Sequence, residues 1–275
     1  MRLQGSTLYT RSNLVLFRGF VWRHYKAHGR HDLPWRKTKD PYKILVSEIM
    51  LQQTQVQRVI AKYEEFLKAF PTVRVLAAAS LSDVLKVWIG LGYNRRAKFL
   101  HDAAKQIVER NSGKFPKTYT ELRALPGVGD YTAKAIRVFA FNQPEVLIET
   151  NIRGALLHHF FPPSRNVPDA KLIPILEQLL HTISNSREWF NALMDYGSHL
   201  KQLYPNPSRR SRHHVKQSKF EGSLRQVRGA ILRAHTQGEE VSDLRNRYSN
   251  QFILAMQSLK RDGLISKRNG KIVLA

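Results

Sequence analysis

The sequence predicts a mainly α-helical protein that ends in a small α+β unit. Three observations support this fold class. Apolar residues recur at helical spacing through most of the first two hundred residues, turn residues separate these stretches, and no stretch before residue 260 alternates as a strand does. With 42% hydrophobic residues among 275, the chain is long enough to form about two domains with cores of their own.

The expected helices follow from apolar periodicity, and Pro or Gly residues mark their ends. The predicted helical segments are 14–25, 42–70, 81–91, 97–109, 118–124, 131–141 and 173–180, and another helix is expected to begin at Thr150. Turns are expected at Asp40-Pro41, Phe70-Pro71, Gly90-Leu91-Gly92, Phe115-Pro116 and Phe161-Pro162-Pro163. No segment repeats another, so the pattern indicates an all-α body rather than a repeat array.

The composition changes after this body. Residues 201–233 hold nine Lys or Arg and one acid, Glu221, which indicates an exposed linker that leads into a new unit. Helices are then expected over 224–234, 241–248 and 251–262, followed by two apolar runs around Asn269-Gly270, a strong hairpin signal. Three helices and a hairpin predict a winged-helix-like unit, with the last helix on DNA and Lys267, Arg268 and Lys271 on the wing. The alternative is a unit that packs on the body or on another protein.

Charge and composition limit the function. Forty-five Lys and Arg against twenty-one Asp and Glu leave a net charge of +24, which is typical of a nucleic-acid-binding protein, although a basic protein can also be merely soluble. The absence of cysteine excludes disulfides, thiolate nucleophiles and cysteine-ligated zinc or iron–sulfur clusters. No apolar run approaches the roughly twenty residues that a membrane span requires. We therefore expect a cytoplasmic, nucleoid-associated protein.

One Gly-rich turn is a candidate phosphate-binding site. Leu125-Pro126-Gly127-Val128-Gly129 lies between two expected helices, where backbone N–H groups at a helix start can face an anion. Such a hairpin can hold a nucleic-acid backbone without reading its sequence. The alternative is a turn with no ligand, because Gly-rich turns often only separate helices.

Two carboxylates are candidates for chemistry. Glu48 is flanked by apolar runs in one expected helix, so we expect it to be buried and protonated, as a general acid must be. Glu149 precedes a new helix, whose N-terminus would favour the ionised form. Cleavage of a glycosidic bond needs one acid and one group that stabilises an oxocarbenium-like sugar. The alternatives are a Glu48 that pairs with a basic residue and a Glu149 that only caps its helix.

Several blocks together resemble a known family. They are LPW at 33–35, SEIMLQQTQV at 47–56, WIGLGYNRRAKFLHDAA at 88–104, GKFP at 113–116, LPGVGDYTAKAI at 125–136 and NALMDYG at 191–197. Over roughly residues 12 to 200 the chain resembles the helix-hairpin-helix DNA glycosylases, and the SEIMLQQTQV block is most similar to the MutY-type adenine glycosylases. The resemblance implies a two-lobed body and hydrolysis of an N-glycosidic bond in DNA.

The resemblance also implies roles for single residues. Glu48 falls on the general acid that protonates adenine at N7, and Asn151 on an active-site amide near the sugar. Tyr131 falls where strand-cleaving relatives have a lysine, which implies a monofunctional glycosylase. Gln53 and Tyr93 match residues that probe or wedge the duplex, and the alternative is that they are plain helix surface or fill the core. The DNA-contacting residues expected from these matches and from the basic segments are Gln52, Gln53, Thr54, Leu91, Gly92, Tyr93, Leu125, Gly127, Val128, Gly129, Tyr131, Arg209, Arg210, Lys267 and Arg268.

Three departures from the family pattern affect these expectations. Glu149 replaces the family's aspartate, and its extra methylene shifts the carboxylate at a centre where ~1 Å can cost ~100-fold in rate. Residues 198–219 are basic and His-rich where most relatives have a cysteine-ligated cluster, so we expect neither an iron–sulfur cluster nor a metal. The C-terminal unit is too short for the 8-oxoguanine-recognising domain of many relatives.

We therefore predict a monomeric, monofunctional DNA glycosylase that removes adenine mispaired with 8-oxoguanine or guanine in double-stranded DNA. The expected divisions are a six-helix domain at 30–141, a second helical domain from 1–29 with 142–200, a basic linker at 201–221 and a winged-helix-like domain at 222–275. Two alternatives remain. One is a mismatch thymine or uracil glycosylase for G·T and G·U pairs, and the other is a duplex-binding protein that Glu149 has left without catalysis.

Overall fold

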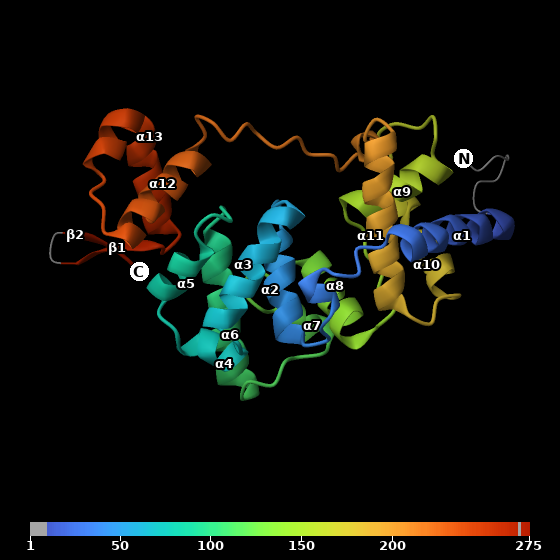
Figure 1. Ribbon diagram of the computed structural model, residues 1–275, viewed down its shortest axis with the longest axis horizontal. Helices are drawn as coiled ribbons and strands as arrows, with labels where there is room; N and C mark the ends of the chain where they lie inside the picture. The colour runs from blue at the N-terminus through green and yellow to red at the C-terminus, as the bar shows by residue number, and fades with distance from the viewer. Residues whose placement is uncertain (1–9, 269–270) are drawn as a thin grey trace. The chain divides into compact units, whose positions relative to one another are not determined.

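The computed structural model describes residues 10–268 and 271–275, and its described part is mainly helical, as the sequence predicts (Figure 1). The chain divides into two compact units. The first unit comprises Met1–Pro41 with Gly129–Lys216, and the second comprises Tyr42–Val128 with Gln217–Ala275. The four-part division expected from the sequence stays a prediction.

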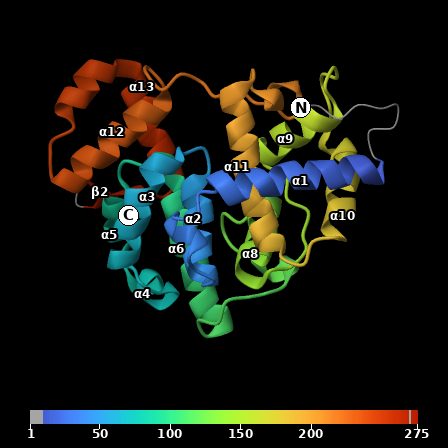
Figure 2. The same ribbon diagram turned by 45° about the vertical axis from the view of Figure 1, so that its right-hand side comes forward.

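The first unit is built around helix α11. Its helices are α1 (Arg11–His28), α8 (Asp130–Phe141), α9 (Thr150–Phe160), α10 (Ile173–Leu180) and α11 (Ser186–Leu203), with 3-10 turns η1 (Pro34–Arg36), η2 (Asp169–Lys171) and η3 (Pro207–Arg210). Helix α11 packs against α1, α8 and α9, and the two views show α1 lying across it (Figures 1 and 2). Phe17 of α1 lies edge-on to Phe160 of α9 and Trp189 of α11, with ring centroids 5.1 and 6.5 Å apart. All three side chains are fully buried, so these helices share one aromatic core.

A buried carboxylate joins α11 to the segment that follows α1. Asp195 accepts from Arg36 at 2.7 and 2.9 Å and from Arg30 at 2.6 Å, and it is 3% exposed. Burial opposes the charge, but hydrogen bonds and the charges of Arg36 and Arg30 lower the pKa of Asp195 below its ordinary value. The carboxylate is therefore ionised at neutral pH and holds Arg30 and Arg36, in the segment that follows α1, against α11.

The second unit begins with six helices, one of which ends earlier than predicted. These are α2 (Pro41–Leu51), α3 (Val56–Ala69), α4 (Val73–Ala78), α5 (Leu81–Trp88), α6 (Arg95–Asn111) and α7 (Tyr119–Arg123). The single helix expected over 42–70 is wrong, because the chain breaks between α2 and α3, where Gln53 takes a left-handed φ of 55°. Helix α4, which Thr72 caps at its N-terminus, was not expected.

The C-terminal part of the second unit confirms the predicted helices and hairpin. Helix α12 (Leu224–Gln237) packs on α13 (Ser242–Arg261), and α13 contains a kink at Ser249 that corresponds to the predicted boundary between two helices. Strands β1 (Ile265–Arg268) and β2 (Lys271–Leu274) pair antiparallel, with Ile265 opposite Leu274. The turn residues Asn269-Gly270 lie outside the described residues. Helix α12 also contacts α5, so this part packs on the helical part of its own unit.

Across residues 10–268 and 271–275, no helix is both long and apolar enough to cross a membrane.

Candidate active site

In the first unit, Glu149 caps helix α9 with its own side chain. Its Oε1 accepts the backbone N–H groups of Asn151 at 2.7 Å and Ile152 at 2.8 Å, and its Oε2 accepts from Asn151 Nδ2 at 3.2 Å. Shorter residues usually occupy this position. The glutamate places one oxygen over two amides and leaves the other oxygen near the Asn151 amide, so it acts as a cap and still presents a carboxylate at the positive end of α9.

Two opposing effects act on the ionisation of Glu149. As predicted, the start of α9 favours the ionised form, because the hydrogen bonds from the backbone N–H groups of Asn151 and Ile152 lower the pKa of Glu149. The positive charges of Lys201 and Arg153 act in the same direction, but burial outweighs these effects and raises the pKa above its ordinary value. The sequence shows the helix start but not the packing around it.

Helix α11 determines the surroundings of this cap. Gly197 lies so close to α9 that an added Cβ would be 2.0 Å from the carbonyl oxygen of Asn151. Only a glycine permits this approach, which accounts for the glycine of the NALMDYG block. Lys201, one helical turn further, is a half-buried residue that the sequence analysis missed. A lysine four residues after a glycine that faces the candidate site was the available signal.

Tyr131 also lies in the first unit, as the second residue of α8, which begins after its N-cap Gly129. Its side chain is half-buried. Helices α8 and α9 both pack on α11, so one helix supports the elements that hold Tyr131, Glu149 and Asn151.

In the second unit, Glu48 lies in the last turns of α2. Its neighbours Ser47 and Ile49 are 1% exposed, as the apolar pattern predicts, but Glu48 itself is half-buried. The expectation that the carboxylate goes fully into the core is therefore wrong. Its side chain lies on the last turn of α2, which ends at Leu51, and keeps partial access to solvent.

One buried guanidinium connects the two loops expected to probe DNA. Arg96 donates to the carbonyl oxygens of Gln52, Leu91 and Gly92 at 2.6, 3.2 and 3.1 Å, and also to those of Ile49 and Met50 and to Thr54 Oγ1. Burial lowers the pKa of Arg96 to about 10, so it stays charged at neutral pH. The sequence analysis did not single out Arg96, because its role depends on carbonyls more than forty residues away.

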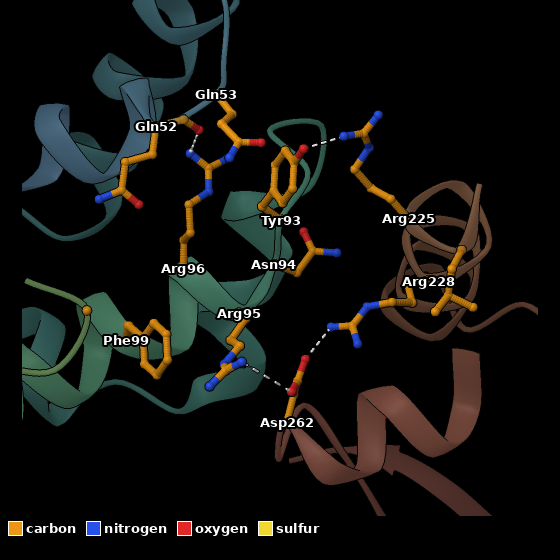
Figure 3. A pocket seen from close by; sticks show the side chains of 12 residues that line it. Gln52, Gln53, Tyr93, Asn94, Arg95, Arg96, Phe99, Arg225, Arg228 and Asp262 are labelled. Carbon is orange, nitrogen blue, oxygen red and sulfur yellow. Dashed lines mark hydrogen bonds and ion pairs between the residues drawn. The ribbon is translucent and has the colours of Figure 1, made fainter. Parts of the chain in front are cut away.

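The structure brings Gln53 and Tyr93 to the same pocket. Both have left-handed backbones, with φ of 55° and 46°, and they line a pocket of about 430 Å³ with Gln52 and Gly127 (Figure 3). Non-glycine residues in this region are strained, which is common where a side chain must be presented for function. Thr54 and Gly92 belong to the same two turns, and Leu91 is buried beneath them.

The predicted phosphate-binding hairpin contains one position that requires glycine. Gly127 has φ +74°, and a Cβ there would lie 2.6 Å from Phe99 Cβ, so glycine is required. Leu125 and Val128 are buried, which leaves their side chains to the core. Any contact of this hairpin with a phosphate would therefore use backbone amides, as expected for the two glycines.

The basic residues predicted to contact DNA have different surroundings. Arg209 and Lys267 are exposed, whereas Arg210 donates to the carbonyls of Leu157, Phe161 and Pro162 at the end of α9. Arg210 therefore also has a structural task as a helix C-cap. The side chain of Arg268 lies outside the described residues.

Arg225 of α12 is a further basic residue that the sequence analysis missed. Its guanidinium donates to the Tyr93 hydroxyl (Figure 3) and lies 5.0 Å from the centre of that ring. Gln217 Nε2 donates to the same hydroxyl at 2.7 Å. Within the second unit, Gln217 and Arg225 thus contact the loop that contains Tyr93, which is one of the two loops expected to probe DNA.

No group of three or more His, Cys, Asp or Glu residues among residues 10–268 and 271–275 is arranged to hold a metal ion. Because the chain has no cysteine, its donor set also does not fit an iron–sulfur cluster.

The chain is similar in sequence to known DNA glycosylases. The chain is 38% identical over 197 residues to the adenine DNA glycosylase of Buchnera aphidicola subsp. Baizongia pistaciae, which covers 71% of this chain and 55% of that protein. It is 46% identical over 126 residues to the adenine DNA glycosylase of Mycobacterium tuberculosis, which covers 46% of this chain and 41% of that protein. The chain therefore spans about half the length of these relatives.

A solved structure is similar across most of its own length. The structure of a thermostable thymine-DNA glycosylase superposes with a TM-score of 0.60 at 25% identity, covering 67% of this chain and 86% of that one. The part of the chain that contains Glu48, the hairpin and Glu149, residues 46–181, matches the HhH-GPD superfamily of base excision DNA repair proteins. Residues 46–181 of this chain therefore form a domain of the HhH-GPD superfamily.

Proposed function

We propose that this protein is a DNA N-glycosylase of base excision repair that removes adenine mispaired with 8-oxoguanine or guanine. The proposal rests mainly on the segment of residues 46–181. This segment matches the superfamily and contains both Glu48 and Glu149, and relatives of the chain are adenine DNA glycosylases. The resemblance of the SEIMLQQTQV block to adenine-specific enzymes supports the choice of base.

The proposed chemistry divides between two carboxylates. Glu48, which keeps solvent access, protonates the flipped adenine and positions water. Glu149, held at the start of α9 by two amides, stabilises the cationic sugar that remains when the base leaves. Tyr131 and Asn151 line the site, and the tyrosine provides no amine for a Schiff base, so release of the base leaves an abasic site in an intact strand.

The proposed substrate is duplex DNA bound by a monomer at the nucleoid. The net charge of +24 supports electrostatic attraction to phosphates, and the glycines of the hairpin support sequence-independent contact with the backbone. Duplex binding should therefore weaken linearly on a plot of log K against log salt concentration.

A second candidate keeps the fold and changes the base. The similarity to a solved thymine-DNA glycosylase, which covers 86% of that chain, favours a G·T or G·U substrate. Both candidates predict an abasic product, so only a substrate panel separates them.

A single-turnover assay over a panel of duplexes tests the proposal. The panel contains adenine opposite 8-oxoguanine, adenine opposite guanine, G·T, G·U and fully paired DNA, and the product is read as alkali-sensitive abasic sites. We expect adenine release by the wild type and its loss in Glu48→Gln. Equal activity in both would refute the role of Glu48, and release of thymine or uracil alone would favour the second candidate. Tight, salt-sensitive binding with no product from any duplex would identify a non-catalytic DNA-binding protein.

Glu149→Asp is the informative companion variant. Aspartate restores the residue of the resembled family but shortens the cap by one methylene. A gain in adenine release would mean that glutamate is a handicap at this site. A loss would mean that the site has been rebuilt around the longer side chain.

A further inference from the structure

The hydrogen bonds of the helix cap do not by themselves offset the effect of burial on the ionisation of Glu149. To stabilise a cationic sugar it must be ionised, a role that rests on the proposed function. Burial acts against ionisation, and the two amides of Asn151 and Ile152 offset the burial only in part. Two positive charges, Lys201 and Arg153, act in favour of the ionised form.

Arg153 is already matched by another carboxylate. Its Nε and Nη2 donate to the two oxygens of Asp169 at 2.8 and 2.7 Å, which is a bidentate ion pair. Its guanidinium therefore belongs to the contact between α9 and η2.

Lys201 is on the face of α11 that approaches the α9 N-terminus. Gly197 contacts the backbone of Asn151, and a residue four positions later lies on the same side of the helix. Lys201 is half-buried, while the next residues, Gln202 and Leu203, are exposed. Burial lowers the pKa of Lys201 and the charge of Glu149 raises it, so each group favours the charged form of the other.

Several other charged groups on elements packed against α9 and α11 have partners of their own. On α8, Asp130 accepts from Lys134 at 3.1 Å and Arg137 donates to Glu145 at 2.5 Å, and on η3, Arg210 donates to carbonyls at the far end of α9. On α1, His24 stacks on His199 with ring centroids 4.5 Å apart. Lys201 acts more strongly on Glu149 than Arg153 does.

We propose that Lys201 is a positioning residue, whose ammonium charge keeps Glu149 ionised and oriented at the start of α9. It contacts neither base nor sugar and acts through Glu149. Removing its charge should make Glu149 take up a proton at a higher pH, by about one pH unit for the loss of a nearby opposite charge. Arginine at this position should keep the charge and most of the effect.

The test measures Glu149 directly in the full-length protein without DNA. Carboxyl carbons of glutamate are labelled with ¹³C, the Glu149 signal is assigned from Glu149→Gln, and its titration is followed by NMR in wild type, Lys201→Met, Lys201→Arg and Lys171→Met. Lys171 is exposed on η2 and serves as the control for losing one positive charge. We expect a higher midpoint only in Lys201→Met. An unchanged midpoint there, or an equal rise in Lys171→Met, would overturn the proposal.

A second experiment measures how the charge of Lys201 affects base excision, and it includes a replacement in case the first variant fails to fold. In single-turnover adenine release, the acid limb of the pH–rate profile should move up by about one unit, ~10-fold in rate on that limb, in Lys201→Met and be restored in Lys201→Arg. Lys201→Gln provides a polar, uncharged replacement if the methionine variant unfolds. If the wild type releases no base, the proposed function fails, whereas the NMR midpoints still decide the role of Lys201.

Discussion

The close approach of α11 to α9 makes Gly197→Ala the sharpest test of how the candidate site is built. The added Cβ would lie 2.0, 2.5 and 3.0 Å from the carbonyl oxygen, carbonyl carbon and Cα of Asn151. All three atoms are backbone, so no side chain can rotate away. The start of α9 must move away from α11 by about 1 Å, and Glu149 and Asn151 move with it.

The size of the effect follows from this geometry. Overpacking a core costs typically 1–3 kcal/mol, and a backbone clash places this variant at about 3 kcal/mol. A displacement of about 1 Å at a reacting centre costs ~100-fold in rate. Stability and adenine release should therefore fall together.

Urea unfolding and single-turnover adenine release measure the two effects, with Gly19→Ala as the matched control. Gly19 lies within α1 of the same unit, and a Cβ there meets nothing within 4 Å. Alanine should be neutral or stabilise α1 by up to about 1 kcal/mol. If Gly197→Ala unfolds at the same urea concentration as the control, then Gly197 does not lie in tight contact with the backbone of Asn151.

Three further predictions concern buried polar groups, and urea unfolding measures each. Arg96→Met should destabilise the protein by at least about 3 kcal/mol, because several carbonyl oxygens lose a buried donor. Arg95→Met, at an exposed neighbour, is the control. A cost below about 1 kcal/mol for Arg96→Met would contradict the role of Arg96. Asp195→Asn should lower the free energy of unfolding by about 3–5 kcal/mol at pH 7. Because the folded-state pKa of Asp195 is lowered, this difference between wild type and variant should persist above about pH 4 and shrink as the pH falls through the lowered pKa. A difference that does not depend on pH would refute the ion pair. Burial lowers the pKa of His159 to about 3, so the unfolded chain takes up the proton first as the pH falls below 6.5. Between pH 7.5 and pH 5, His159→Phe should therefore lose about 2 kcal/mol less of its free energy of unfolding than the wild type does. Identical pH dependence in both proteins would contradict a buried neutral imidazole.

Much of the fold is visible in the sequence because it depends on local patterns. The segment 173–180 was predicted from apolar spacing and forms α10 (Ile173–Leu180), and α8 begins within one residue of its predicted start. The break after Leu51 was not visible, since Gln52-Gln53-Thr54 contains no typical turn residue. Arg96 stabilises that break from α6, far along the chain.

The candidate site shows the same division. Residue type and order made Glu48, Glu149 and the hairpin candidates, and the family resemblance added Tyr131, whereas Lys201, Arg96 and Arg225 became apparent only from their surroundings in the structure. These three cations act on groups distant in sequence, and a basic chain offers too many Lys and Arg residues to choose among without contacts.

By itself, the sequence determined the helical class, the terminal hairpin, the positive charge and the two carboxylates that the family resemblance marks for catalysis. The tertiary structure decided the state of those carboxylates. The helix start was expected to favour the ionised form of Glu149 and does so through two amides, but the packing around the carboxylate raises its pKa overall. Glu48 was expected to be buried from its apolar neighbours, and it is only half-buried. The reason is that hydrogen bonds of a helix start are local, whereas desolvation depends on every atom that packs nearby, whatever its position in the chain.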